Sequence, residues 1–188
     1  MWKIYFLLWV SGSGKTTLFH ELDQIDQSDF VYVPSYTSRD MRPGEVQGEK
    51  YRHISPEEFD QAIANGEFLE RAHSTASETK YGSKSKDLIE PTKEWKNTIK
   101  ETDAQWLLKM IQEWKLDERF VTIFLDIDDV TISERLKMRW SAHEIENRTR
   151  IAKSERDIAR QHCDYIIDAG RELDNVRNDF FEILGINT

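Results

Sequence analysis

The chain is short of cysteine and glycine, and it has no long hydrophobic run. Its one cysteine, Cys163, excludes an internal disulfide framework, fits a reducing cytoplasm and is expected to serve packing rather than chemistry. The run "IYFLLWV", residues 4–10, is too short to span a membrane, and no cleavage site for a signal peptide follows it. We therefore expect a buried strand there, with neither a signal peptide nor a membrane span.

Basic residues are outnumbered by acidic ones, 26 against 35, which leaves a formal net charge of -9. A negative charge of this size disfavours non-specific binding to nucleic acid or to anionic membranes. Any phosphate site must then be a local cluster of donors. At 188 residues the chain suits one nucleotide-sized α/β domain with a small insertion.

A glycine loop with the sequence "SGSGKTT", residues 11–17, follows the apolar run and precedes a helical pattern. This context favours a phosphate-binding loop of the form G-x-x-x-x-G-K-[ST] over a glycine turn with an incidental Gly-Lys-Thr. Backbone N–H groups would hold the β-phosphate, Lys15 would reach the β- and γ-phosphates, and the Thr16 hydroxyl would ligate Mg²⁺. The expected ATP contacts are Ser11, Gly12, Ser13, Gly14, Lys15, Thr16 and Thr17.

The rest of the chain alternates strands and helices around a different middle part. Short strands at 121–127 and 164–168 each precede a helical pattern, at 130–139 and 172–184, which predicts a parallel sheet with right-handed crossovers. The middle part contains a helix with Ser55 as N-cap, Glu58 closing a capping box and Gly66 at its end. Strand-like runs at 50–55 and 67–73 flank this helix, as in a small α+β insertion.

Residues 34–72, "PSYTSRDMRPGEVQGEKYRHISPEEFDQAIANGEFLERA", resemble the GMP-binding region of guanylate kinases. With the phosphate loop and the later strands, the resemblance covers essentially the whole chain. It implies an α/β fold of the P-loop NTPase type: a parallel sheet flanked by helices, a small α+β GMP-binding insertion and a helical lid. The implied parts are a core of 1–33, 89–134 and 149–188, an insertion of 34–88 and a lid of 135–148.

The resemblance also implies a GMP site. Arg39 and Arg42 are three apart in a loop and could clamp a phosphate by charge-assisted bonds, although two such arginines alone would fit a solvated loop. A carboxylate at Glu70 can accept from guanine N1–H and from the exocyclic amine together, whereas adenine has no donor at N1. The residues implied to hold the phosphate are Arg39, Arg42, Tyr51 and Tyr81. Those implied to contact the base are Ser35, Glu70, Ser83 and Asp103.

Further family positions concern the metal and the transferring phosphoryl group. Glu101 matches an acidic position near the magnesium ion, and Arg135, Arg139 and Arg148 match arginines that neutralise the phosphoryl group. The spacing from Arg139 to Arg148 is about two residues shorter than in the family, so Arg150 competes with Arg148 for this role. The basic stretch 137–156 is either a solvated helix face or a mobile flap over phosphates.

The implied activity is Mg²⁺-dependent transfer of the ATP γ-phosphate to GMP or dGMP, giving ADP and GDP in the cytoplasm. The expected partners are the small-molecule substrates ATP and GMP, and the protein is expected to be a monomer or a homodimer. The reaction needs no covalent nucleophile. Two alternatives are a guanylate-kinase-like interaction module that has lost ATP binding, and a small-molecule kinase with another acceptor. Lys15, Thr16 and the arginines disfavour the first, and the guanine set disfavours the second.

Five of the six tryptophans stand where glycine is expected. Trp9, Trp106 and Trp140 occupy glycine positions of the family pattern, while Trp95 and Trp114 end helical patterns where a left-handed cap favours glycine. Eight glycines in 188 residues are about 4.3%, against about 7% on average. We hypothesise that all six tryptophan codons are UGA, read as tryptophan although the living protein carries glycine; UGG codons would refute this. The rival is a degenerate kinase with true tryptophans.

Overall fold

The computed structural model describes residues 2–22, 29–74, 78–114, 118–137 and 141–186. It divides into two compact units. The first unit comprises Met1–Ile4 with Asp29–Glu101, and the second comprises Tyr5–Ser28 with Thr102–Thr188. The division into core, insertion and lid stays a prediction.

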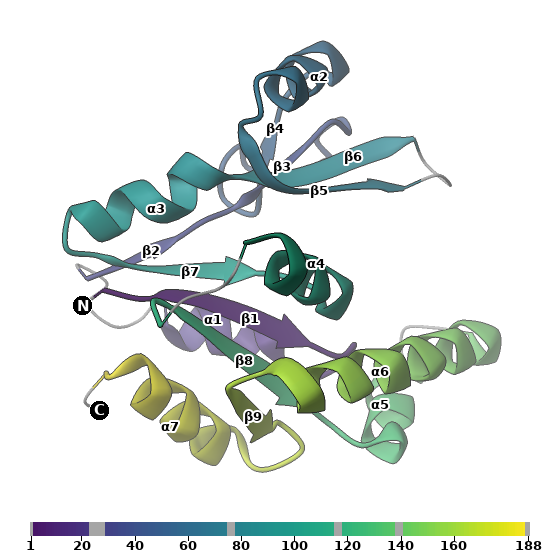
Figure 1. The fold of residues 1–188 in the computed structure, drawn as a ribbon. Helices are drawn as coiled ribbons and strands as arrows, with labels where there is room; N and C mark the ends of the chain where they lie inside the picture. The colour runs from purple at the N-terminus through teal and green to yellow at the C-terminus, as the bar shows by residue number, and fades with distance from the viewer. Residues whose placement is uncertain (1, 23–28, 75–77, 115–117, 138–140, 187–188) are drawn as a thin grey trace. The chain divides into compact units, whose positions relative to one another are not determined.

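The second unit is built on three strands in the order β1-β8-β9, with β1 at Ile4–Trp9, β8 at Phe120–Asp126 and β9 at Tyr165–Asp168 (Figure 1). Strand β8 runs parallel to β9. Five of the six β1 residues are buried, which explains their continuous apolar character. The strands expected at 121–127 and 164–168 are confirmed to within one residue.

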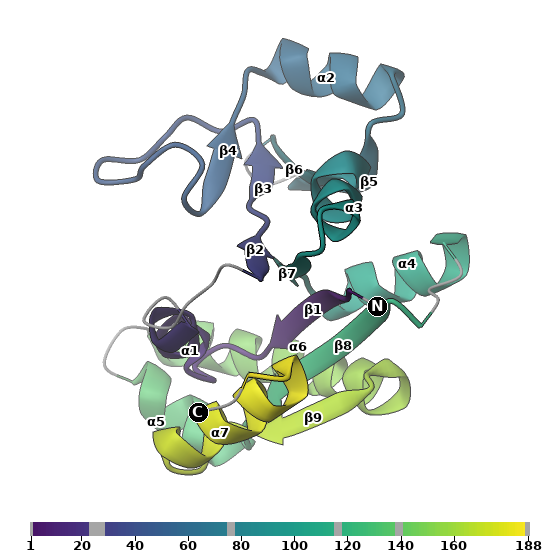
Figure 2. The ribbon, with the colours of Figure 1, turned by 90° about the vertical axis from the view of Figure 1, so that its left-hand side faces the viewer.

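The described part of the second unit contains the helices α1 (Lys15–Leu22), α4 (Ala104–Trp114), α5 (Asp129–Leu136), α6 (Ala142–His162) and α7 (Leu173–Leu184). Figure 2 shows α1 and α7 on one side of the strands and α4 on the other. Helix α6 packs against α4 and α5. The predicted α/β arrangement of parallel strands flanked by helices is therefore observed.

The first unit contains a strand pair and a four-stranded sheet. Strand β2 (Phe30–Tyr32) runs parallel to β7 (Asn97–Glu101). The sheet has the order β4-β3-β6-β5, with strand bounds Tyr51–His53, Ser35–Thr37, Thr79–Lys84 and Phe68–Ser74. Helix α3 (Ser85–Lys93) packs against β7 and β6.

Helix α2 (Pro56–Ala64) lies over this sheet and matches its prediction. Ser55 and Glu58 form both hydrogen bonds of the capping box, and Gly66 after the helix has φ +66°. The Phe59 ring stacks on the Phe68 ring with centroids 4.4 Å apart. These two rings centre the small apolar core of the first unit.

The basic stretch at 137–156 is helical from Ala142 onward, which fits the helix-face alternative for that part, while the alternative of a flap over phosphates stays a prediction. Arg156 pairs with Asp126 at 2.7 Å and donates to the Ile127 carbonyl at 2.5 Å, which ties α6 to the end of β8. Arg139 and Trp140 lie outside the described residues.

Two of the tryptophans predicted to cap helices differ in backbone conformation. Trp95 has φ +65°, so the left-handed conformation expected there is confirmed. Trp114 is the last residue of α4 and is helical, so the expectation of a left-handed residue was wrong at this position.

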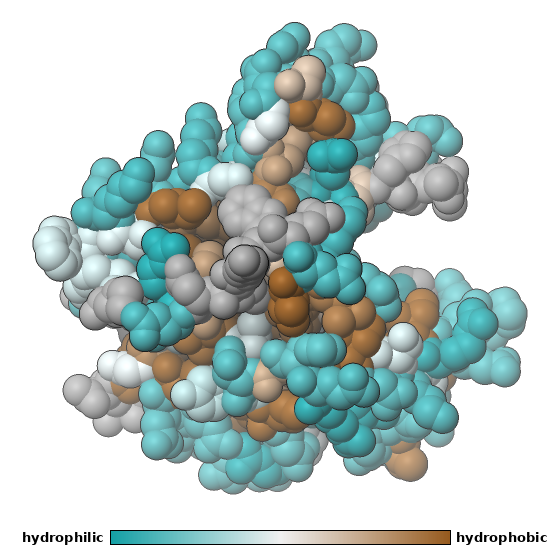
Figure 3. Space-filling view, viewed as in Figure 1, coloured by the Kyte–Doolittle hydropathy of each residue, from teal (hydrophilic) through white to brown (hydrophobic). Residues whose placement is uncertain are grey.

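Hydrophilic residues dominate the face shown in Figure 3, in line with a chain in which 32% of residues are charged. Among the described residues, no helix has the length and apolar character needed to cross a membrane.

Candidate nucleotide-binding sites

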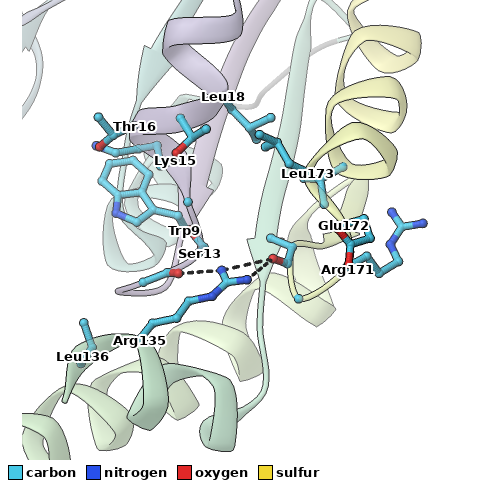
Figure 4. Close-up of a pocket in the computed structure, with 16 residues that line it drawn as sticks. Trp9, Ser13, Lys15, Thr16, Leu18, Arg135, Leu136, Arg171, Glu172 and Leu173 are labelled. Atoms are coloured by element: carbon cyan, nitrogen blue, oxygen red, sulfur yellow. Dashed lines mark hydrogen bonds between the residues drawn. The ribbon is translucent and has the colours of Figure 1, made fainter. Parts of the chain in front are cut away.

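The phosphate loop of the second unit joins β1 to α1 and lines a cavity of about 880 Å³ (Figure 4). Gly12 and Gly14 both have φ +86°, a conformation that glycine adopts without strain. Helix α1 begins at Lys15, so the positive end of its dipole faces the loop. Of the predicted ATP contacts, this cavity is lined by Gly12, Ser13, Gly14, Lys15, Thr16 and Thr17.

Ser13 and Ser11 differ from the other loop residues. Ser13 is 4% exposed as a residue, and its buried hydroxyl has no hydrogen-bond partner among the described residues. Any contact of Ser13 with a nucleotide would therefore be made by its backbone. Ser11 lines a neighbouring cavity instead.

The Lys15 ammonium lies over the indole of Trp9, 3.7 Å from the ring centroid. This is a cation–π contact, which stabilises by about 0.5 to 2 kcal/mol depending on exposure. Figure 4 shows both side chains beside the loop. The residue predicted to reach the β- and γ-phosphates thus has an aromatic partner at the position where the loop pattern has glycine.

Arg135 of α5 connects the phosphate loop to the segment after β9. Its guanidinium donates to the Gly12 carbonyl at 2.9 Å and to the Ala169 carbonyl at 3.3 Å (Figure 4). Arg135 therefore lies at the rim of the cavity, where it positions the loop.

A second cavity of the same unit, about 440 Å³, is lined by Trp9, Ser11, Thr102, Asp103, Arg148 and Glu155 among others. Arg148 donates to the Ser11 hydroxyl at 2.9 Å, whereas the exposed Arg150 donates to Asn147 at 3.2 Å. Of the two competing arginines, Arg148 is the one that reaches the phosphate loop.

Three carboxylates, Asp103, Glu144 and Glu155, line this second cavity. Asp103 accepts from the backbone N–H of Trp106 at 2.9 Å and so caps α4. Partial loss of solvent raises the pKa of Asp103, although its side chain keeps exposed surface. Burial, and then the charge of Asp103, raise the pKa of Glu155 to about 7.

In the first unit, Arg39 and Glu45 form a bidentate ion pair with N–O distances of 2.6 and 2.7 Å. The Glu45 carboxylate also accepts from the Arg42 backbone N–H at 2.8 Å and lies 3.5 Å from His53. The hydrogen bonds from Arg39 and Arg42 lower the pKa of Glu45 to about 2. A fixed carboxylate therefore holds Arg39 in the forked geometry that also suits a phosphate.

Two predicted tyrosines lie beside this pair. The Arg39 guanidinium is 5.1 Å from the Tyr51 ring centroid, and the Tyr51 and Tyr81 rings are 5.9 Å apart. The Arg42 side chain is exposed. Three of the four residues predicted to hold the GMP phosphate, Arg39, Tyr51 and Tyr81, are thus brought together.

The residues predicted to contact the base form a row across β5, β6 and β3. Glu70 is paired with Ser83, and Tyr36 with Gly82, so Ser35 falls in line with Ser83 on the next strand. Paired residues of antiparallel strands share one face of a sheet. The buried Ser83 hydroxyl donates to Glu70. Three of the four predicted base contacts therefore lie on one face of the first unit, while Asp103 belongs to the second.

Gly82 makes this row possible. A Cβ at position 82 would lie 2.7 Å from the Glu70 carbonyl oxygen and 2.7 Å from the Phe68 ring. Strand β6 could not approach β5 so closely with any other residue there.

Of the two residues predicted to hold magnesium, Thr16 fits that ion. The Thr16 side chain is exposed in the phosphate-loop cavity, where a hydroxyl can join phosphate oxygens around Mg²⁺. Glu101, at the end of β7, forms a hydrogen bond with Tyr32. The described residues contain no cluster of three or more His, Cys, Asp or Glu side chains suited to a metal.

Sequence reasoning missed Glu45, Glu155 and Lys100. Glu45 had a local signal, because it follows Arg42 by three residues in a glycine turn. The other two contact the predicted site only through folding. Cys163 is half-buried and burial raises the pKa of its thiol to about 12, in keeping with a packing role.

A unit of parallel strands and flanking helices, with a glycine-rich loop opening α1, defines a P-loop nucleotide-binding protein. The guanylate kinase family model matches residues 1–184, and the chain belongs to this family.

Known proteins agree with that assignment. The guanylate kinase of Malacoplasma penetrans is 32% identical over 186 residues, which cover 96% of this chain and 93% of the relative. That of Chlamydia trachomatis serovar D is 29% identical over 88% of this chain and 78% of the relative. The crystal structure of guanylate kinase from Anaplasma phagocytophilum has a TM-score of 0.69 and 24% identity, covering 98% of this chain and 85% of that one. The predicted family, fold class and enzyme status are confirmed.

Proposed function

We propose that this chain transfers the γ-phosphoryl group of ATP to GMP, with ATP held by the second unit and GMP by the first. Family membership supports this reaction over an interaction module, because the relatives named above are guanylate kinases. One observation carries the assignment of the GMP site: the row of Glu70, Ser83 and Ser35 lies in the same unit as the ion pair between Arg39 and Glu45.

The phosphate loop would hold the β-phosphate by backbone N–H groups, and Lys15 would move from the Trp9 ring to the β- and γ-phosphates. The role of Glu101 at the metal rests on the family pattern. The Thr16 hydroxyl would hold Mg²⁺ together with phosphate oxygens, and the bound ion would supply positive charge beside the transferring group. Arg148 and Arg135, both tied to the loop, would contribute further positive charge beside it.

GMP would bind with its phosphate on Arg39, Tyr51 and Tyr81 and its base on the row. Glu70 accepts from N1–H and from the 2-amino group of guanine, a pairing that adenine cannot reproduce. Arg42 and the Tyr hydroxyls would complete the phosphate contacts. No step requires a covalent nucleophile, so the protein acts by positioning and by charge. The roles of Asp103 and Arg139 rest on the family pattern.

The test is GMP-dependent formation of ADP from Mg-ATP, with AMP, UMP and ribose 5-phosphate as competing acceptors. We expect turnover with GMP. In Lys15→Met the rate of ADP formation should fall by at least about a hundredfold, because the negative charge of the transferred phosphoryl group loses a positively charged partner. The control is Lys80→Met, which removes an ion pair between Lys80 of β6 and Asp60 of α2. Lys80 lies on the same sheet as the residues predicted to contact the base but is not one of them. A folded protein that binds GMP without turnover would instead favour the interaction module.

A further inference from the structure

Lys100 is a buried lysine in β7, beside the row of residues that contact the base. The residue is 1% exposed, and its ammonium donates to the Ser35 hydroxyl oxygen at 2.5 Å. Lysine is almost never buried to this degree without a specific partner. The two residues are 65 positions apart, so only the fold joins them.

The chemistry of this hydrogen bond gives it a direction. An ammonium group has three donors and no acceptor, whereas a serine hydroxyl has one donor and two acceptor lone pairs. Ser35 must therefore accept from Lys100, and its own proton points to an acceptor elsewhere. Because Ser35 is only half-buried, that proton is available to a ligand.

The row thus offers a purine both a hydrogen-bond acceptor and a hydrogen-bond donor at fixed positions. At one end, the Glu70 carboxylate can only accept hydrogen bonds; at the other, Ser35 is held as a donor. Guanine presents donors at N1 and at its 2-amino group and an acceptor at O6, whereas adenine presents an amine, a donor, at position 6. The two ends of the row complement the guanine edge.

We propose that Lys100 is a positioning residue for guanine recognition, which fixes Ser35 as a donor to O6 and so rejects purines with a 6-amino group. This inference rests on the proposed function of Ser35 and Glu70 in binding GMP. Without Lys100, the Ser35 hydroxyl could donate a hydrogen bond to a 6-oxo group or accept one from a 6-amino group, and so would not discriminate between them.

The experiment compares GMP with 2,6-diaminopurine ribonucleoside 5′-monophosphate as acceptors. The two differ at position 6 and in the proton at N1, and the N1 contribution to discrimination is the same in every variant that keeps Glu70. In Lys100→Met we expect kcat/KM for GMP to fall about tenfold, mainly through KM, and the ratio of GMP to diaminopurine activity to fall by a similar factor. Lys80→Met should leave the ratio unchanged.

A double-mutant cycle tests whether Lys100 acts through Ser35. Ser35→Ala should itself lower the ratio, and adding Lys100→Met to it should change the ratio no further. If Lys100→Met slows both acceptors equally, or adds its full effect to Ser35→Ala, Lys100 is only a core residue and the inference fails. If Lys100→Met does not fold, Lys100→Gln takes its place, since an amide can both donate and accept.

Failure of the proposed function has a different signature. If the wild-type protein forms no ADP with GMP, the same ratio is measured by calorimetric binding of the two monophosphates. A wild-type preference for GMP that Lys100→Met reduces supports the inference without turnover, and an unchanged preference overturns it. Active wild type with an unchanged ratio in Lys100→Met overturns the inference alone.

Discussion

Trp95 combines a left-handed backbone with an exposed side chain. Its φ of +65° is unfavourable for any residue with a Cβ, and an indole that is 73% exposed gains little from burial. The chain adopts this turn because the segment after α3 must enter β7, which begins at Asn97. The residue type and the backbone conformation at this position are in conflict.

We therefore expect Trp95→Gly to raise the free energy of unfolding by about 1 kcal/mol. Chemical denaturation monitored by circular dichroism measures the change. The control is Trp106→Gly, in the first turn of α4 and without positive φ, where glycine should cost about 1 kcal/mol. A loss of stability in Trp95→Gly would contradict the argument.

The contact between Trp9 and Lys15 leads to a prediction about ATP. Binding must draw the ammonium off the ring, at a cost of about 0.5 to 2 kcal/mol. We expect Trp9→Gly to lower KM for ATP by about twofold to thirtyfold and to leave KM for GMP unchanged. Steady-state kinetics with each substrate varied in turn measures this, with Trp95→Gly as the matched control. An increase of KM for ATP would mean that the indole assists the nucleotide.

At the scale of elements, α4 and α6 bring Asp103 and Glu155 to one cavity. The raised pKa of Glu155, about 7 against 4.5 in the unfolded chain, has a definite sign. Between these values the native protein keeps a proton that the unfolded chain has lost, so the contribution of Glu155 to stability is full below pH 4.5 and is lost as pH rises towards 7.

Glu155→Gln should remove this dependence. We expect the difference in unfolding free energy between wild type and Glu155→Gln to shift by at most about 3 kcal/mol between pH 4.5 and 7, with the wild type losing stability relative to the variant. Urea denaturation across this range gives the difference, and Glu146→Gln, exposed on the same helix, is the control. Parallel curves for wild type and Glu155→Gln would show that Glu155 titrates normally.

Local sequence was a sufficient guide for most elements and failed at defined points. The capping box of α2 and the loop that opens α1 depend on residues three to five apart, so they were visible in the sequence. The backbone conformation of Trp114 was predicted wrongly, because the sequence around the end of a helix does not fix which residue is the last helical one.

At the scale of the whole molecule, the tryptophans and glycines can be tested together. Replacing all six tryptophans by glycine would bring glycine from 8 to 14 of 188 residues, about 7.4%, which is an ordinary share. If the six codons are UGA read with the wrong code, the six-glycine protein should form ADP from ATP and GMP faster than the protein with tryptophan. The assay is the one described above, run on both proteins side by side.

Equal activity of the two proteins would show that the tryptophans are tolerated, and a slower six-glycine protein would count against recoding. The coding DNA offers an independent check, since UGG at these positions excludes recoding outright.

The sequence by itself determined the glycine loop that opens α1, the strands β1, β8 and β9, and the family, because each depends on residue types at short, regular spacings. Strands β2, β3, β6 and β7 were not predicted. Only the tertiary structure decided which side chains act on which. Arg148 reaches Ser11 across 137 positions, Arg135 reaches Gly12 across 123, and Lys100 reaches Ser35 across 65. Such contacts arise when packing brings distant segments together, and no local pattern of residues encodes them.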